Sequence, residues 1–478
     1  MSKLWYSLSV ISIPQWARDS IQKECTNFLW NFGSHLVSYK TIIGEKHDGG
    51  LKIADIYLKM LSFRLKFLAK HFCCNKDFLW KHIFRYFLSK IQNLGAGMEI
   101  FLLQFKKTDL EGLPQFYNEL LCAWYAIKDY IIVTEKENDV FNYCLFFNPK
   151  VQRRNKMLNW KDFISASITH VKDISYEVIP GFLPISCIVE IFQEQNSEVN
   201  VSLITKNYKD LLLSIPEEWK NYVHENEYKR TCFQPNFDIS YRDQRIVFQS
   251  GTVQIFYNLL VQKMFQEPVS NIYWRDKLDM NDKSSIEKRW ETVWVLYKTP
   301  DITELDFKIF HNIIFTYEKL FKIGKSDSKI CPICMLECED IMHLFIRCKE
   351  LAEFKNNFVI YHLESLLKDC ESDVFNRLNF EEIFMTALHK GIKNVNVFFV
   401  NYFISVCRFC IYRRRQIFLQ SEKKIDIERL CRYTLRHYIS YNHYQLTVLE
   451  KKMNLFKKFF LHRNPLLKET EGILLFIF

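Results

Sequence analysis

Four residues in the last third of the chain have the spacing of a metal site. Cys331, Cys334, His343 and Cys348 follow the pattern C-x2-C-x8-H-x4-C. Structural zinc ions are held by four thiolate or imidazole ligands in a tetrahedron, and three cysteines with one histidine are a standard set. A C-x-x-C pair at a tight turn places two thiolates on one side of the ion, and a short helix or turn presents the other two ligands. The spacing therefore predicts a small zinc loop over residues 331–348.

A metal-free group of thiols is the alternative, because the chain contains 15 cysteines. The local sequence favours the metal. Pro332 stiffens the turn, residues 337–340 form a polar loop between the two ligand pairs, and Leu344 and Phe345 can pack beneath the site. Cys338 is a spare candidate that could replace one ligand. Zinc is accordingly the cofactor that the sequence predicts.

The residue types needed for polymerase or nucleotide chemistry are missing. Metal-assisted polymerisation needs clustered carboxylates around divalent cations, and the sequence contains no adjacent pair of aspartates. Gly324-Lys325-Ser326 resembles the end of a P-loop, but Lys319 stands where that loop needs a glycine. Cys407 and Cys410 fall on a predicted helix without a second ligand pair, so we expect buried thiols there. We predict no catalytic residue and no enzyme activity.

The positive charge of the chain is concentrated towards its C-terminal end. The net charge is +10, and residues 401–478 hold 15 Lys or Arg against 6 Asp or Glu. Such a basic region attracts polyanions, in particular nucleic-acid phosphates. The residues predicted to contact phosphates are Arg413, Arg414, Arg415, Lys423 and Lys424. A solvated helix end is the alternative interpretation of these residues.

The composition predicts a folded, intracellular protein. Of the 478 residues, 48% are hydrophobic and 16% aromatic, with 12 glycines and 11 prolines, which suits a large core better than disorder. The first residues lack the apolar core and cleavage site of a secretory signal. Residues 397–412 are apolar but include Asn401 and Arg408 and are too short to span a bilayer, so we expect a buried amphipathic helix. We expect a cytoplasmic or nuclear location and no membrane partner.

The spacing of apolar residues is mostly helical. Two stripes, over residues 21–32 and 58–72, are predicted to be core faces of amphipathic helices, with a turn at residues 48–50. Residues 174–191 are predicted as loop and residues 233–250 as a short hairpin. Further helices are predicted over residues 116–128, 285–320, 383–388, 395–418 and 425–441, and another begins at Pro216. The predicted fold class is mainly α.

Several short segments occur in a distinctive order along the chain. The first are Ile13-Pro14-Gln15-Trp16, Phe28-Leu29-Trp30, Asp48-Gly49-Gly50-Leu51 and Ala54-Asp55. The next are Leu113-Pro114-Gln115-Phe116-Tyr117, Ala123-Trp124, Phe147-Asn148-Pro149, and Ile215-Pro216 with Trp219. The last are Trp294 with Tyr297 and Pro300, Phe310-His311, Thr316, the cysteine and histidine quartet, and Tyr412-Arg413-Arg414-Arg415. From about residue 10 to residue 440, this ordered set resembles the region after the thumb of LINE-type non-LTR retrotransposon reverse transcriptases.

The resemblance implies that the chain corresponds to the C-terminal, post-thumb and zinc-binding part of such a reverse transcriptase. The endonuclease and polymerase palm of the family would lie upstream and are absent, so no catalytic carboxylate can be carried over. The metal quartet and a presumed RNA contact of the C-terminal module can be carried over. The implied parts are a post-thumb helical region (1–130), a connector of mixed or irregular structure (131–280), a helical segment with the zinc loop (281–360) and C-terminal basic helices (361–478).

The sequence thus favours a truncated, non-catalytic, zinc-stabilised remnant of a reverse transcriptase. We expect this remnant to bind RNA or another nucleic acid. Other proteins of the same element are further expected partners. A helical protein-interaction module is one alternative, since zinc loops bind proteins as readily as RNA. A non-functional remnant is another, in which the apolar faces over residues 21–32 and 58–72 would be exposed and promote aggregation. By family, the chain would also be classed as a reverse transcriptase, an RNA-directed DNA polymerase.

Overall fold

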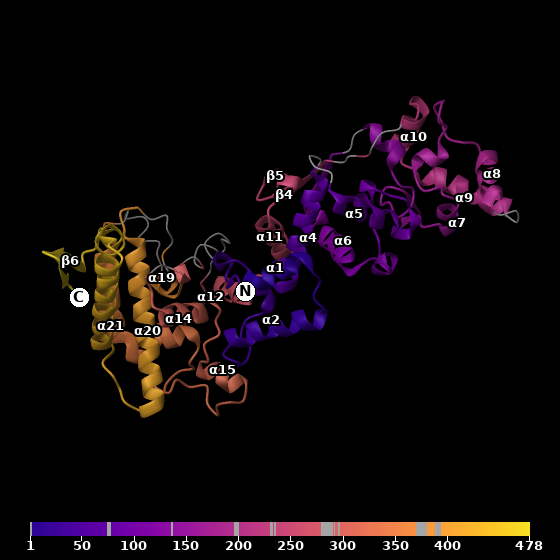
Figure 1. The fold of residues 1–478 in the computed structure, drawn as a ribbon. Helices are drawn as coiled ribbons and strands as arrows, with labels where there is room; N and C mark the ends of the chain where they lie inside the picture. The colour runs from indigo at the N-terminus through magenta and orange to yellow at the C-terminus, as the bar shows by residue number, and fades with distance from the viewer. Residues whose placement is uncertain are drawn as a thin grey trace. The chain divides into compact units, whose positions relative to one another are not determined.

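The computed structural model describes residues 2–73, 78–134, 137–195, 200–229, 233, 236–278, 290, 292–294, 297–369, 380–386, 388 and 393–478. The structure is mainly helical, as the sequence predicts (Figure 1). The chain divides into two compact units. Unit 1 comprises Met1–Phe28 and Asp55–Met264, and unit 2 comprises Leu29–Ala54 and Phe265–Phe478. The four parts implied by the family resemblance stay a prediction.

Unit 1 consists of helices around a small antiparallel sheet. Its helices are α1 (Ser2–Val10), α2 (Gln15–Leu29), α4 (Ile56–Phe72), α5 (Leu79–Ser89), α6 (Gln115–Ala126), α7 (Lys161–Ser165), α8 (Ile185–Gln195), α9 (Val201–Ser214), α10 (Glu217–Glu225) and α11 (Val253–Met264). Its strands are β1 (Ile131–Thr134), β2 (Gln152–Arg153), β3 (Lys156–Met157), β4 (Asn236–Tyr241) and β5 (Gln244–Val247). The sheet order is β1-β4-β5, and β2 pairs with β3.

Helix α4 forms the core of unit 1, as its apolar stripe predicts. It begins at Asp55, whose side-chain Oδ1 accepts a hydrogen bond from the Leu58 backbone N–H at 2.7 Å. The helix packs against α1, α6 and α11. The stripe residues are buried: Leu58, Leu61, Leu65, Leu68 and Phe72. The non-functional alternative predicted an exposed apolar face over residues 58–72. That prediction is wrong, because this face is buried.

The other predicted apolar stripe, over residues 21–32, differs from what the structure shows for helix α2. The helix ends at Leu29, and Asn31 and Phe32 adopt left-handed backbone with φ of 47° and 58°. Phe28 is 79% exposed, and Thr26 is the buried residue of this helix. Ile21 and Cys25 are half-buried, whereas Phe28, Leu29 and Phe32 are exposed in the part of the chain that the structure describes, so the prediction of a core face over residues 21–32 is wrong for its second half.

Two loop predictions in unit 1 have different outcomes. The hairpin predicted over residues 233–250 is confirmed by β4 and β5, which are joined through Arg242 and Asp243 at φ of 51° and 60°. The loop predicted over residues 174–191 is wrong from Ile185, where α8 begins. Proline is compatible with the start of a helix, and the carbonyl of Pro184 accepts the first helical hydrogen bonds there.

Unit 2 is built from helices around α20. Its α-helices are α3 (Tyr39–Ile42), α12 (Val269–Leu278), α14 (Pro300–Phe310), α15 (Tyr317–Lys322), α16 (Ala352–Phe354), α17 (Tyr361–Leu367), α19 (Phe380–Thr386), α20 (Val397–Ser421), α21 (Ile427–Tyr444) and α22 (Met453–Phe456). The π-helical turns are η9 (His343–Arg347), η11 (Lys355–Ile360), η12 (Gln445–Leu449) and η13 (Lys457–Leu461). Strands β6 (Leu467–Thr470) and β7 (Ile473–Phe476) form a hairpin.

The predicted helices of unit 2 are confirmed where the structure describes them. Helices α19, α20 and α21 match the predictions over residues 383–388, 395–418 and 425–441. The helices predicted over residues 285–320 correspond in the described residues to α14 and α15, which are separated at Asn312, where φ is a left-handed 52°. Residues 285–289 of that range lie outside the described residues.

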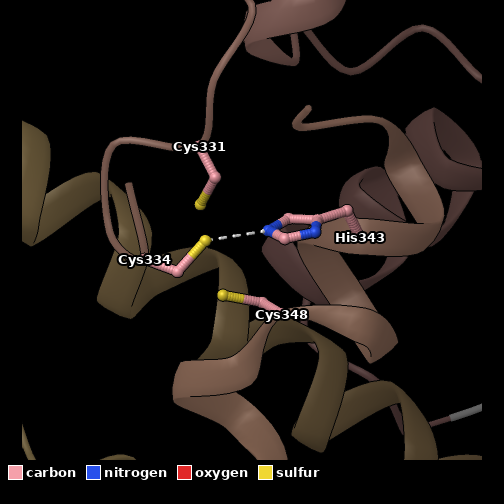
Figure 2. Close-up of side chains that lie close together, drawn as sticks. All are labelled: Cys331, Cys334, His343 and Cys348. Carbon is pink, nitrogen blue, oxygen red and sulfur yellow. Dashed lines mark hydrogen bonds between the residues drawn. The ribbon is translucent and has the colours of Figure 1, made fainter. Parts of the chain in front are cut away.

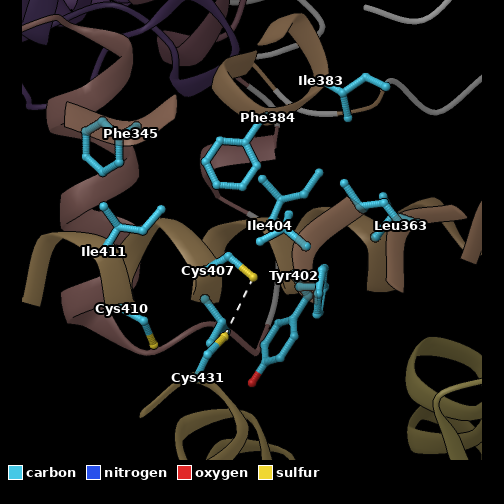
Figure 3. Close-up of a cluster of buried hydrophobic side chains, with 14 of the residues drawn as sticks. Phe345, Leu363, Ile383, Phe384, Tyr402, Ile404, Cys407, Cys410, Ile411 and Cys431 are labelled. Atoms are coloured by element: carbon cyan, nitrogen blue, oxygen red, sulfur yellow. Dashed lines mark hydrogen bonds between the residues drawn. The ribbon is translucent and has the colours of Figure 1, made fainter. Parts of the chain in front are cut away.

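Helix α20 is buried on almost every side along its first four turns. Figure 3 shows Phe384 of α19 and Leu363 of α17 on one side of it, and Cys431 of α21 on the other. Cys407 and Cys410 are fully buried, as predicted, and the sulfur of Cys407 lies 3.7 Å from that of Cys431. Among the described residues, no helix combines the length and the apolar character that crossing a bilayer requires.

A buried ion network fixes α20 against α14. Asp306 of α14 lies 2.7 Å from the Nζ of Lys298 and 2.7 Å from the Nη2 of Arg408, and all three side chains are 1% exposed. Burial alone would raise the pKa of Asp306, but the two cations lower it. Because an isolated buried charge is costly, this arrangement fixes how α20 packs on α14.

His311 joins the first segment of unit 2 to its remainder. Its Nε2 donates a hydrogen bond to the Gly49 carbonyl at 2.9 Å, and its ring packs against Trp290 and Phe307 at centroid distances of 4.6 Å and 4.3 Å. Gly49 has a φ of 87°, and a Cβ there would lie 2.8 Å from Trp290, so this turn requires glycine. Burial lowers the pKa of His311 to about 4.

The His311 contact predicts a loss of stability in mild acid. An unfolded histidine takes up a proton near pH 6.5, whereas folded His311 stays neutral down to about pH 4. The unfolded state therefore binds more protons between these values, and stability falls as the pH falls through them, by at most about 3 kcal/mol. Urea unfolding at several pH values should show a smaller pH dependence for His311→Gln than for the wild type. The exposed His47→Gln serves as the control, and equal pH dependence in all three proteins would contradict the assignment.

Candidate metal centre

The first two cysteines of the quartet lie on a tight turn. An isolated antiparallel bridge joins Ile330 to Cys338 and closes the turn at its base. Within it the Cys331 N–H donates to the Glu337 carbonyl at 2.7 Å, and the Met335 N–H donates to the Cys331 carbonyl at 2.9 Å. Met335 has a left-handed φ of 58°, which lets the chain reverse after Cys334. Both thiols therefore emerge on the same side of the turn.

The other two ligands lie on one π-helical turn. The Asp340 carboxylate accepts a hydrogen bond from the His343 N–H at 2.6 Å and so begins the turn η9. The Cys348 N–H then donates to the His343 carbonyl at 3.0 Å, five residues back. A π-turn places residues i and i+5 one above the other. This geometry explains why a spacing of five residues presents both side chains to the same point.

The four side chains converge as a tetrahedral site requires (Figure 2). Their ligand atoms all lie within 4.8 Å of one another, and the Cys334 sulfur lies 3.4 Å from the His343 Nε2. Ideal zinc bond lengths predict about 3.5 Å for this edge of the tetrahedron. The prediction of a Cys3His group that could hold a metal ion is confirmed. Cys338 is not part of the group and lies in the bridge at the base of the turn.

The electrostatics of the quartet favour a positive charge at its centre. A hydrogen bond to Cys331 raises the pKa of His343 to about 9, against the opposing effect of burial. The contact between Cys331 and Cys348 lowers the pKa of the Cys331 thiol and raises that of Cys348. Metal ligands must be deprotonated, so binding of an ion here releases protons.

Glu337 orients the histidine from outside the quartet. Its Oε2 lies 3.1 Å from the Nδ1 of His343, on the ring side opposite the sulfur of Cys334. A carboxylate in this position holds a proton on Nδ1 and leaves Nε2 as the ligand. The sequence shows Glu337 only as part of a polar loop, although an acidic residue between two ligand pairs was a usable signal.

A buried ion pair attaches the metal loop to α20. Glu339 is fully buried, and its two carboxylate oxygens accept hydrogen bonds from Nε and Nη2 of Arg415 at 2.8 Å and 2.7 Å. The Tyr317 N–H donates to the same carboxylate at 2.8 Å. A fork of this kind fixes orientation as well as distance. Burial opposes the charge of Arg415, but Glu339 raises its pKa.

The predicted phosphate-binding residues separate into two groups. Arg414 and Arg415 are 7% and 4% exposed, and Arg414 donates to the Glu350 carbonyl at 3.1 Å. These two arginines hold the segment around the metal site rather than facing solvent. Arg413, Lys423 and Lys424 are exposed on the end of α20 and the turn that follows. Nucleic-acid binding by any of the five stays a prediction.

Removing one partner of the Glu339–Arg415 pair should destabilise unit 2. Glu339→Ala leaves a buried guanidinium without its carboxylate, which costs about 3–5 kcal/mol. The double variant Glu339→Met with Arg415→Met removes both charges and should recover most of the loss. Urea unfolding of the two proteins and of the exposed control Lys424→Ala measures this. A double variant no more stable than Glu339→Ala would contradict the assigned role of the pair.

Glu337→Gln should weaken metal binding while leaving the fold intact. The amide cannot hold the Nδ1 proton as a carboxylate does, and such outer-shell changes typically lower affinity about 10–100-fold. Competition with a chromophoric chelator gives the affinity for Zn²⁺. The exposed Glu353→Gln is the matched control. If both variants bind as tightly as the wild type, Glu337 has no part in the centre.

Comparison with known proteins gives one distant relationship. No protein-family model matches the chain. The chain is similar to the Transposon TX1 uncharacterized 149 kDa protein of Xenopus laevis, with 21% identity over 379 residues. The similarity covers 73% of this chain and 28% of the relative, so the chain spans less than a third of that protein's length. The chain is therefore a distant homologue of a transposon protein, carrying a Cys3His group that could hold a metal ion.

Proposed function

We propose that this chain is a non-catalytic, transposon-derived nucleic-acid-binding protein, related to the C-terminal part of LINE-type reverse transcriptases. The attachment of the Cys3His group to α20 supports this proposal most strongly. Two buried arginines hold the metal segment, while Arg413 on the same helix and Lys423 just after it face solvent. The metal centre would thus give a rigid base to a cationic surface.

Zinc is the metal that the donor set favours. Three thiolates and one imidazole suit zinc in a closed, four-coordinate structural site. With all four positions taken by protein ligands, no position remains for a reacting water. A thiolate site of this kind also needs a reducing compartment, which supports a cytoplasmic or nuclear location.

The outward face of α21 extends the cationic surface with aromatic rings. Helices α20 and α21 lie side by side (Figure 1). Tyr433 is 69% exposed and stacks on His437 with parallel rings at 6.1 Å. Arg429 and Arg436 are exposed on the same helix. Exposed rings beside cations are the usual features that bind unpaired bases and the phosphates between them. Single-stranded RNA is therefore the proposed ligand.

Protein docking is the second candidate function, and one observation favours it. Met335 and Leu336, adjacent at the tip of the metal loop, are 70% and 62% exposed. Exposed apolar residues on a rigid loop suit a protein partner, such as another protein of the same element. In that case Met335→Ser with Leu336→Ser would abolish partner binding, and RNA binding would be absent or unspecific.

Neutralising the exposed cations should weaken RNA binding and its salt dependence together. The test variant carries Arg413→Gln, Lys423→Gln and Lys424→Gln. The binding constant K for single-stranded RNA is measured at several salt concentrations, and log K is plotted against log salt concentration. The slope of this plot should become less steep by about 2, since each lost phosphate contact removes about 0.7. The control makes the same charge change on exposed lysines of unit 1, with Lys90→Gln, Lys106→Gln and Lys107→Gln. Equal effects of the two variants would refute a specific RNA surface in unit 2.

A further inference from the structure

A second group of side chains that could bind a metal ion lies in unit 1. Its members are far apart in the sequence and form no short motif. Cys144 and His170 face each other in an isolated antiparallel bridge. Backbone hydrogen bonds of 2.9 Å and 3.0 Å join the residues on either side of the pair, so the two residues form a non-hydrogen-bonded pair. Side chains of such pairs stand closest together in antiparallel structure. The bridge therefore brings a thiol and an imidazole into contact.

Glu99 adds a carboxylate from a different part of the chain. It lies in the 3-10 turn η3 (Met98–Leu102), where its Oε1 accepts a hydrogen bond from the Gly97 N–H at 2.8 Å. This contact directs the carboxylate to the histidine. The His170 Nε2 lies 3.2 Å from the Glu99 Oε1 and 3.4 Å from the Cys144 sulfur. All three ligand atoms lie within 4.8 Å of one another.

The other ring nitrogen of His170 already has a partner. Its Nδ1 lies 2.8 Å from the Thr169 hydroxyl, and that hydroxyl lies 3.2 Å from Oδ2 of Asp173. The Asp173 carboxylate accepts a hydrogen bond from the Thr169 hydroxyl, so the hydroxyl oxygen accepts in turn from Nδ1–H. Nε2 then faces the Cys144 sulfur and the Glu99 carboxylate oxygen, which are the other two ligand atoms of the group. Imidazole nitrogen, thiolate sulfur and carboxylate oxygen are all atoms that bind a divalent metal ion such as zinc.

The three side chains are shielded from solvent. Cys144 is fully buried, and the His170 and Glu99 side chains are 6% and 12% exposed. One metal ion between the three ligand atoms can bind all of them at once, and Cys144 would lose its thiol proton on binding.

We propose that Glu99, Cys144 and His170 bind a zinc-like divalent metal ion in unit 1. The geometry matches the Cys3His group in two respects. In both, Nε2 lies 3.4 Å from a cysteine sulfur, and Nδ1 faces an acidic group directly or through a hydroxyl. Thiolate, imidazole and carboxylate are all zinc ligands. Three protein ligands are one fewer than in the Cys3His group, so this ion binds more weakly and is the first to be lost to a chelator. It connects η3 to the Cys144–His170 bridge.

Metal titration of the full-length chain tests this proposal. The reduced, metal-stripped protein is titrated with Co²⁺, whose thiolate complexes absorb in the near ultraviolet, and the Co²⁺ is then displaced with Zn²⁺. Wild type should take up one equivalent more than Glu99→Gln or Cys144→Ser. Cys187→Ser, at a half-buried thiol elsewhere in unit 1, should match the wild type. The difference between proteins is the readout, so it does not depend on the Cys3His group.

A measurement on the wild type alone covers the case in which the variants do not fold. Added Zn²⁺ should slow amide hydrogen exchange at Leu145 and Val171, which flank the bridge. Equal metal uptake by wild type and Glu99→Gln, or exchange at these two amides that Zn²⁺ leaves unchanged, would overturn the proposal. A proton on Nε2 would then hold the group together in place of a metal ion.

Discussion

A buried guanidinium must be paired, and this requirement organises unit 2. Helix α20 carries three buried arginines, Arg408, Arg414 and Arg415, at 1%, 7% and 4% exposure. Arg408 pairs with Asp306 of α14, and Arg415 pairs with Glu339 of the metal loop. Leaving any of these charges unpaired would cost several kcal/mol. Helix α20 can therefore pack in few registers, and the register that satisfies all three arginines also sets the position of the loop that carries the cysteines.

The features that the sequence predicted correctly are the local ones. The quartet lies within 18 residues, and its spacing alone defines the turn and the π-helical step that bring the ligands together. The α4 stripe and the hairpin over residues 233–250 likewise depend on periodicity and turn residues. The exposure of Phe28 and the burial of Arg414 and Arg415 were not predictable in this way. These properties depend on which distant segment packs against a side chain, and a run of three arginines looks the same whether its carboxylates are near or absent.

The two metal-ligating groups show this difference within one protein. All four residues of the Cys3His group lie in one short segment, so their spacing in the sequence identifies the group. Glu99, Cys144 and His170 come from three separate segments, and nothing in their spacing distinguishes them from other residues of these types. Only the antiparallel bridge and the turn at Gly97 bring them together. Sites of this second kind become visible only once long-range pairing is known.

The division of the chain also has a consequence for folding during synthesis. Unit 2 begins with Leu29–Ala54 but resumes only at Phe265, after all of unit 1 has been made. On a ribosome, the segment with Gly49 must wait on the order of 10 s or more before Trp290 and His311 emerge to pack against it. During that interval its apolar side chains lack the partners that Trp290, Phe307 and Phe310 later provide, whereas Asp55–Met264 can already fold. Chaperone dependence of the nascent chain should therefore concentrate on this short early segment rather than on the larger helical body that follows it.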